Sequence, residues 1–150
     1  MIARTQEFPY QVIAYIHDPE LGKPVGPPWR THVTVKRRFK LRDGVNEHQL
    51  VKVLEDTISA MPAIYMQLGG MIQFGNSEAI EVTNHDQWQA LHTTLLQQLE
   101  PFIITCDPQF EGLNSRFHLS VTFRGVPVAD AADYYGRDFE ITKLWLVKEA

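Results

Sequence analysis

Two short segments of the chain each place a hydroxyl residue two positions after a histidine. "HVTV" occupies residues 32–35 and "HLSV" occupies residues 118–121. Histidine titrates near neutral pH, so one imidazole of a pair can serve as general base while the other, protonated, serves as general acid. Hydroxyl groups can donate hydrogen bonds to the nonbridging oxygens of a phosphate as charge develops on them. This combination suits chemistry on a phosphodiester, and that chemistry requires no metal.

The first of these segments lies in a stretch, residues 31–39, that predicts a β-strand because β-branched and aromatic residues dominate it. Successive side chains of a strand point to opposite faces. We therefore expect one apolar face, formed by Val33, Val35 and Phe39, and one polar face, formed by His32, Thr34, Lys36 and Arg38.

The second segment lies in another predicted strand, residues 116–123, and repeats the pattern. Its apolar face would carry Phe117, Leu119, Val121 and Phe123, and its polar face would carry Arg116, His118, Ser120 and Thr122, with Arg124 just beyond. Either strand alone is explained most simply as an amphipathic strand with one wet face. The repetition of the pattern favours a shared site with two imidazoles, two hydroxyls and positive charge.

Cations and aromatic rings near the two histidines are candidates for binding the rest of a substrate. Arg116 lies two residues before His118, whereas the other cations of the polar faces lie about 13–20 Å along their strands. Aromatic faces stack on any nucleobase, which makes Trp29 and Tyr10 candidates for base stacking. Packing in the core is the competing interpretation for both rings, and a solvated surface position is the competing interpretation for Arg116.

The remaining elements alternate between strands and helices. Asn46 and Asn84 are each followed three residues later by a glutamine and then by an apolar stripe of helical period, so each marks the start of a helix. Further strands are predicted at residues 10–17, 63–74, 79–83 and 139–147, with Gly69 and Gly70 marking a bulge or turn. This order predicts an α+β fold with helices packed on antiparallel sheets.

One more group of polar side chains lies on the second predicted helix. His85, Gln89 and His92 share one face of it. His85 and His92 are two helical turns apart, too far for comfortable joint ligation of a metal, so we expect a solvated helix surface there and no metal site.

Length and composition restrict the class of protein. A chain of 150 residues forms one ordinary domain with a sizeable core, and Cys106, its single cysteine, excludes an internal disulfide. The first ten residues lack the apolar stretch of a secretory signal, and no apolar run reaches the roughly 18 residues that a membrane span requires. We expect a cytoplasmic monomer without a membrane partner.

The two segments "HVTV" and "HLSV", in matching strand contexts 86 residues apart (118 − 32 = 86), resemble the paired motifs of the 2H phosphoesterase superfamily. The resemblance covers nearly the whole chain. It implies a single domain, residues 1–150, made of two similar α+β lobes whose motifs face each other across a cleft. It also implies that His32 and His118 are the acid–base pair, that Thr34 and Ser120 bind phosphate, and that no cofactor is needed.

The same resemblance implies several reactions. The first is metal-independent hydrolysis of a 2′,3′-cyclic or 2′-5′ phosphodiester of a nucleotide or RNA end. Reversible joining of RNA ends by the same residues and binding of a nucleotide or RNA end without turnover are the alternatives. The formal net charge of −4 does not suit a protein that holds long RNA through its phosphates, and this favours a small nucleotide or an RNA terminus.

Overall fold

The computed structural model describes residues 7–17, 31–123 and 125–148. In chain order, its helices and strands are β1 (Tyr10–Tyr15), β2 (His32–Leu41), α2 (Glu47–Ser59), β3 (Ile64–Phe74), β4 (Ser77–Val82), α3 (His85–Leu99), β5 (Ile103–Thr105), β6 (His118–Phe123), β7 (Val126–Pro127), β8 (Asp138–Ile141) and β9 (Trp145–Lys148). Short 3-10 turns lie at Pro108–Phe110, Gly112–Asn114 and Ala131–Asp133. The α+β class expected from the sequence is confirmed.

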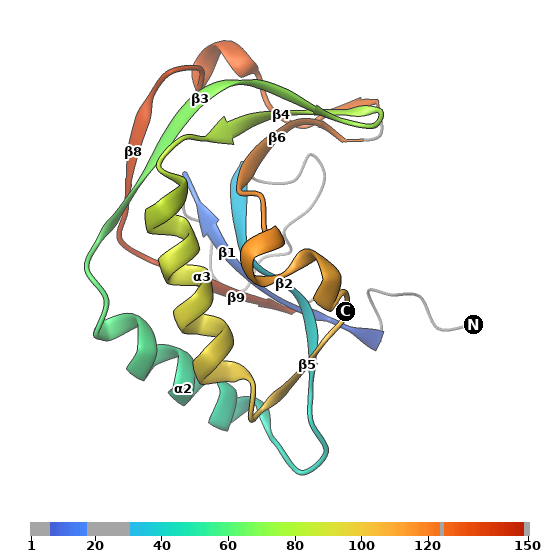
Figure 1. Cartoon of the computed structure of the whole chain (residues 1–150), viewed down its shortest axis with the longest axis vertical. Coiled ribbons are helices and arrows are strands. Elements are labelled where there is room, and N and C mark those ends of the chain that lie inside the picture. The colour runs from blue at the N-terminus through green and yellow to red at the C-terminus, as the bar shows by residue number, and fades with distance from the viewer. Residues whose placement is uncertain (1–6, 18–30, 124, 149–150) are drawn as a thin grey trace.

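The strands of the described residues form one antiparallel sheet in the order β8-β3-β4-β6-β2-β1-β9, with β5 added to β2 and β7 added to β6. Figure 1 shows this sheet as a strongly curled layer, with α2 and α3 next to each other along one side of it. The two strands that carry the histidine motifs, β2 and β6, are neighbours in the middle of this order.

The core lies between the sheet and the two helices. The central strands contribute Val33 and Leu119, both with no exposed surface, and α3 contributes a buried stripe of Trp88, Leu91, Leu95 and Leu99. Burial of such large apolar side chains stabilises the fold by about 1.5–3 kcal/mol each.

The start of α2 is fixed by the predicted capping arrangement, because Asn46 and Gln49 exchange hydrogen bonds between side chain and backbone at 2.9 Å.

The predicted bend at the glycine pair is also present. The register between β3 and β4 shifts between Leu68 and Met71, which indicates a bulge at Gly69 and Gly70. A side chain at Gly69 would collide with the methyl group of Thr83, the residue after β4, so the packing at this bulge favours glycine.

The carboxyl-terminal segment differs from the single strand that the sequence predicted. It forms two strands, β8 and β9, which lie at opposite edges of the sheet. Seven flat strands would be about 29 Å wide, whereas the chain from Ile141 to Trp145 reaches at most about 14 Å. The curl of the sheet therefore brings its two edges close enough for three residues to connect them (Figure 1).

The predicted polar face of β2 is wrong at Lys36. The pairing of β2 with β1 changes register twice, between Ile13 and Val12 and between Val12 and Tyr10, so β2 carries extra residues there. Each extra residue reverses the alternation of faces beyond it. As a result Val35 and Lys36 are both buried, and Lys36 has no exposed surface at all.

The buried lysine belongs to a polar cluster between β2, α3 and the segment that precedes β6. Its ammonium lies 2.8 Å from Glu111 Oε1. Burial lowers the pKa of Lys36, and the adjacent carboxylate opposes this shift. On the other side of Glu111, His92 Nδ1 donates to the Val35 carbonyl at 2.8 Å and His92 Nε2 accepts from the Gly112 amide at 2.9 Å.

The expected solvated face of the second helix is therefore wrong at His92, which is 1 % exposed, while His85 on the same helix is exposed. An imidazole can be buried in this position because each of its ring nitrogens has a backbone partner. The apolar stripe of α3 gave no sign of this, since the partners come from β2 and from the segment before β6.

Removal of the buried ammonium should destabilise the fold strongly. In Lys36→Met the Glu111 carboxylate stays buried without the ammonium, with only the His92 imidazole beside it at 3.1 Å, and we expect the free energy of unfolding to fall by about 3–5 kcal/mol. Urea unfolding followed by circular dichroism measures this loss. Lys52→Met is the matched control, because Lys52 pairs with Asp56 on the surface at 3.3 Å and should change stability little. Equal small losses in both variants would contradict the structural role of the buried pair.

Candidate active site

The two histidine motifs meet where β2 and β6 pair. The antiparallel register places Val33 opposite Leu119, and both side chains point into the core. Their sequence neighbours point to the opposite face. His32 and Thr34 therefore flank this pair on β2, and Ser120 and His118 flank it on β6. Since the strands are antiparallel, His32 lies on the side of Ser120 and Thr34 on the side of His118.

The structure thus brings together the four side chains that the sequence singled out: His32, Thr34, His118 and Ser120. Directly opposed residues of an antiparallel pair have Cβ atoms about 4.5–5.5 Å apart, which is close enough for all four to contact one phosphate group. Two further strands border this array. Tyr15 of β1 lies opposite His32, and Glu81 of β4 lies opposite His118.

His118 is held in a defined tautomer. Its Nδ1 lies 3.0 Å from the carbonyl oxygen of Arg116, so Nδ1 carries the hydrogen that it donates to this acceptor. Nε2 of the neutral ring then has a lone pair. A nitrogen in this state can accept a proton, which is the requirement for a general base.

The surroundings of His118 favour its neutral form. Burial lowers the pKa of this imidazole, and the positive charges of His32, Arg116 and Arg37 lower it further. The hydrogen bond to the Arg116 carbonyl acts in the opposite direction, but the pKa remains below its ordinary value of 6.5. The lowered pKa therefore favours the neutral form of His118 at pH 7.

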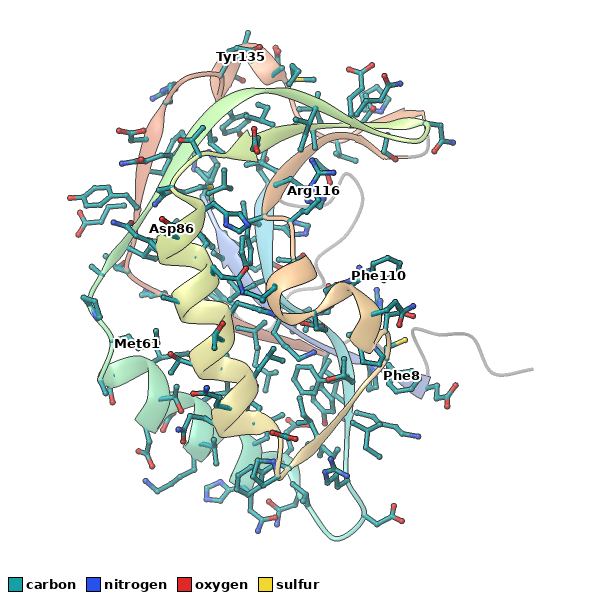
Figure 2. All side chains as sticks on the ribbon, in the orientation of Figure 1. Phe8, Met61, Asp86, Phe110, Arg116 and Tyr135 are labelled. Atoms are coloured by element: carbon teal, nitrogen blue, oxygen red, sulfur yellow. The ribbon has the colours of Figure 1, made fainter. Side chains whose placement is uncertain are left out.

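Among the described residues, two arginines contribute positive charge that acts on His118. Arg116, which the sequence selected, lies two residues before β6, and Figure 2 shows its side chain there, with Phe110 in the segment that precedes it. Arg37, which the sequence did not single out, follows the buried Lys36 on β2. The bulges turn it to the exposed side, where its guanidinium lies 4.9 Å from the centre of the Phe110 ring and its charge acts on His118.

The aromatic neighbours of the site differ from those that the sequence suggested. Tyr10 is 5 % exposed, pairs with the far end of β2 at Phe39 and stacks on that ring, so it has no open face for a base. Trp29 lies outside the described residues. The ring of Tyr15 instead lies 5.8 Å from the His32 ring and 6.3 Å from the Trp145 ring.

Sequence inspection missed Tyr15, Glu81 and Arg37 as neighbours of the histidines, and Trp145 as a neighbour of Tyr15. Each reaches the site through strand pairing or a bulge, and no motif marks them. Thr122 lies further along the same strand as His118, where its hydroxyl accepts a hydrogen bond from the Glu78 amide at 3.0 Å. Arg124, like Trp29, is outside the described part of the chain.

Two general features of the described residues bear on function. None of the helices in this part of the chain is both long enough and apolar enough to cross a membrane. Over the same residues, no three histidine, cysteine, aspartate or glutamate side chains come together in a way that would hold a metal ion.

Comparison with known proteins gives one family. The family model of the 2′-5′ RNA ligase superfamily matches residues 6–150. This match confirms the resemblance that the two motifs indicated, and it suggests an RNA or nucleotide substrate. No curated protein matches the chain.

The electrostatic coupling of the two histidines can be measured directly. In an NMR titration we expect the His118 ring to titrate below pH 6.5, with Nδ1 carrying the hydrogen of the neutral form. In His32→Asn the neighbouring positive charge is absent, so the pKa of His118 should rise toward 6.5. His48→Asn, on the exposed side of α2, is the control and should leave the titration of His118 unchanged. A pKa of His118 above 6.5 in the unaltered protein would contradict this description of the site.

Proposed function

Because the chain belongs to the 2′-5′ RNA ligase superfamily, we propose that it is a phosphodiesterase that hydrolyses a 2′,3′-cyclic or 2′-5′ phosphodiester of a nucleotide or RNA end. This proposal depends on one observation: the two histidine motifs lie side by side on β2 and β6, because Val33 pairs with Leu119. It supplies two imidazoles and two hydroxyls on one face of the sheet, with Arg116 beside them.

We assign the base role to His118 and the acid role to His32. The Nε2 lone pair of neutral His118 takes a proton from water as the water oxygen attacks phosphorus. The bond between phosphorus and the leaving ribose oxygen then breaks, and protonated His32 gives its proton to that oxygen. The lowered pKa of His118 supports this assignment because it favours the neutral ring, and the bond to the Arg116 carbonyl supports it because it keeps the hydrogen on Nδ1 and leaves the lone pair on Nε2.

Thr34 and Ser120 bind the nonbridging phosphate oxygens in this proposal. Negative charge grows on these oxygens when the water attacks, and hydroxyl donors that are already in place stabilise it. The guanidinium of Arg116 adds charge-assisted hydrogen bonding to the same oxygens. The acidic balance of the chain, with a formal net charge of −4, favours a nucleotide or a short RNA end over a long RNA.

Hydrolysis of the four 2′,3′-cyclic nucleoside monophosphates in the presence of EDTA tests the proposal. We expect turnover in EDTA and a fall in kcat of about 10²–10⁴ in both His32→Ala and His118→Ala. Thr34→Val and Ser120→Ala should each lower kcat by about 10²–10³. Quantifying the products by chromatography also shows which ribose oxygen leaves.

His48→Ala is the matched control, since His48 is exposed on α2 and lies outside the site. Its kcat should equal that of the unaltered protein. Activity that survives in both site variants would contradict the two-histidine mechanism. Circularised or lengthened product from RNA with 2′,3′-cyclic phosphate and 5′-hydroxyl ends would assign joining to the same residues.

The pH dependence of the reaction should be bell-shaped, because one histidine must be neutral and the other protonated. His118 as the base is inactive when protonated, and its lowered pKa places the acid limb of kcat/KM below pH 6.5. Arg37→Gln removes a positive charge that acts on His118, so this limb should move to higher pH. Arg42→Gln, an exposed arginine that donates to the Glu100 carbonyl, is the control. A flat profile between pH 5 and 9 is the result that excludes this mechanism.

A further inference from the structure

A cavity of about 130 Å³ lies beside the proposed general base. Its walls are formed by Ile72 of β3, Glu81 of β4, His85 at the start of α3, and Arg116 and Phe117 just before β6. Of these five residues, only Arg116 has a proposed role in binding the reacting phosphate. The cavity is therefore an extension of the site toward β3 and α3.

The cavity is close to the atoms that react. Glu81 lies directly opposite His118 in the pairing of β4 with β6, and Arg116 supplies the carbonyl that holds the His118 ring. A substrate whose phosphate contacts His118 would therefore have its sugar and base within reach of this cavity. On the other side of the site, Tyr15 borders His32.

The polar groups of the cavity include both acceptors and donors. The exposed Glu81 carboxylate supplies two acceptor oxygens, and the Arg116 guanidinium supplies only donors. His85 Nε2 lies 3.3 Å from the Ser115 carbonyl, so Nε2 donates to this oxygen and Nδ1 is an acceptor. The walls between these groups are apolar, because the His85 ring packs on Phe117 at 5.5 Å between ring centres and Ile72 faces them.

The size of the cavity limits what it accepts. A cavity of about 150 Å³ accepts one benzene ring, so a cavity of about 130 Å³ has room for roughly one six-membered aromatic ring. The five residues that line the cavity suit a flat aromatic ring. One part of the edge of this ring would carry hydrogen-bond donors that face Glu81, and another part would carry an acceptor that faces Arg116.

We propose that this cavity is the nucleobase subsite and that it selects a six-membered ring with both an exocyclic amino group and a carbonyl oxygen, namely cytosine or the six-membered ring of guanine, whose five-membered ring and ribose then lie outside the cavity. The carboxylate of Glu81 accepts from the amino group, and the Arg116 guanidinium, which has five N–H donors, donates to the carbonyl oxygen with those that do not contact the phosphate. Adenine offers no carbonyl oxygen to Arg116. Uracil offers no amino group, and its N3–H lies between two carbonyl oxygens, one of which would face the carboxylate.

This proposal rests on the proposed function, and its test uses the four 2′,3′-cyclic nucleoside monophosphates separately. We expect kcat/KM for the guanosine or the cytidine substrate to exceed that for adenosine and uridine by about tenfold or more. In Glu81→Ala this ratio should fall to within about twofold of unity. Glu78→Ala is the control, because Glu78 is an exposed carboxylate of the same strand that does not line the cavity, and its ratio should stay unchanged.

The outcomes separate the subsite from the hydrolysis. Turnover of all four substrates with equal kcat/KM, or an unchanged preference in Glu81→Ala, would overturn the base subsite and leave the phosphodiesterase proposal standing. If none of the four is hydrolysed, calorimetry with the guanosine, cytidine, adenosine and uridine 3′-monophosphates decides. Tighter binding of guanylate or cytidylate that Glu81→Ala abolishes would support the subsite without turnover, and equal binding of all four would overturn it.

Discussion

The contact between β2 and β6 determines the position of every group in the site. Val33 and Leu119 lie opposite each other with no exposed surface, and the core on their side of the sheet includes α3. Side chains on either side of this pair must point the other way, because a strand alternates its faces. Hydrophobic burial on one face thus fixes two histidines and two hydroxyls on the other face, although the two strands are 86 residues apart in sequence (118 − 32 = 86).

The bulges in β2 give this site its particular charge distribution. They bury Lys36 against Glu111 and turn Arg37 toward the exposed side, where its charge acts on His118. A buried ion pair contributes little net stability compared with apolar packing. Its effect here is geometric, since the cluster around Glu111 connects β2 and α3 to the segment that leads into β6.

Because the sheet is curled, Tyr15 and Trp145 lie together at the edge of the site next to His32. β8 and β9 are consecutive in the chain but lie at opposite edges of the sheet. This connection brings Trp145 onto the face of β1 where Tyr15 lies, opposite His32. On the side of His118, the bulge at Gly69 and Gly70 and the start of α3 form the border, and the cavity with Glu81 lies there.

The sequence by itself determined the fold class, the two motif strands, the capped start of α2, and the alternation that places His32 with Thr34 on one face of β2 and His118 with Ser120 on one face of β6. These features depend on local periodicity and on a repeated motif, both of which can be recognised without knowledge of strand order. Tertiary structure alone decided the burial of Lys36 and His92, the separation of β8 from β9, the packing of Tyr10 on Phe39, and the approach of Arg37 and Glu81 to His118. Bulges and strand order produce these features, and both depend on contacts between residues that are distant in sequence.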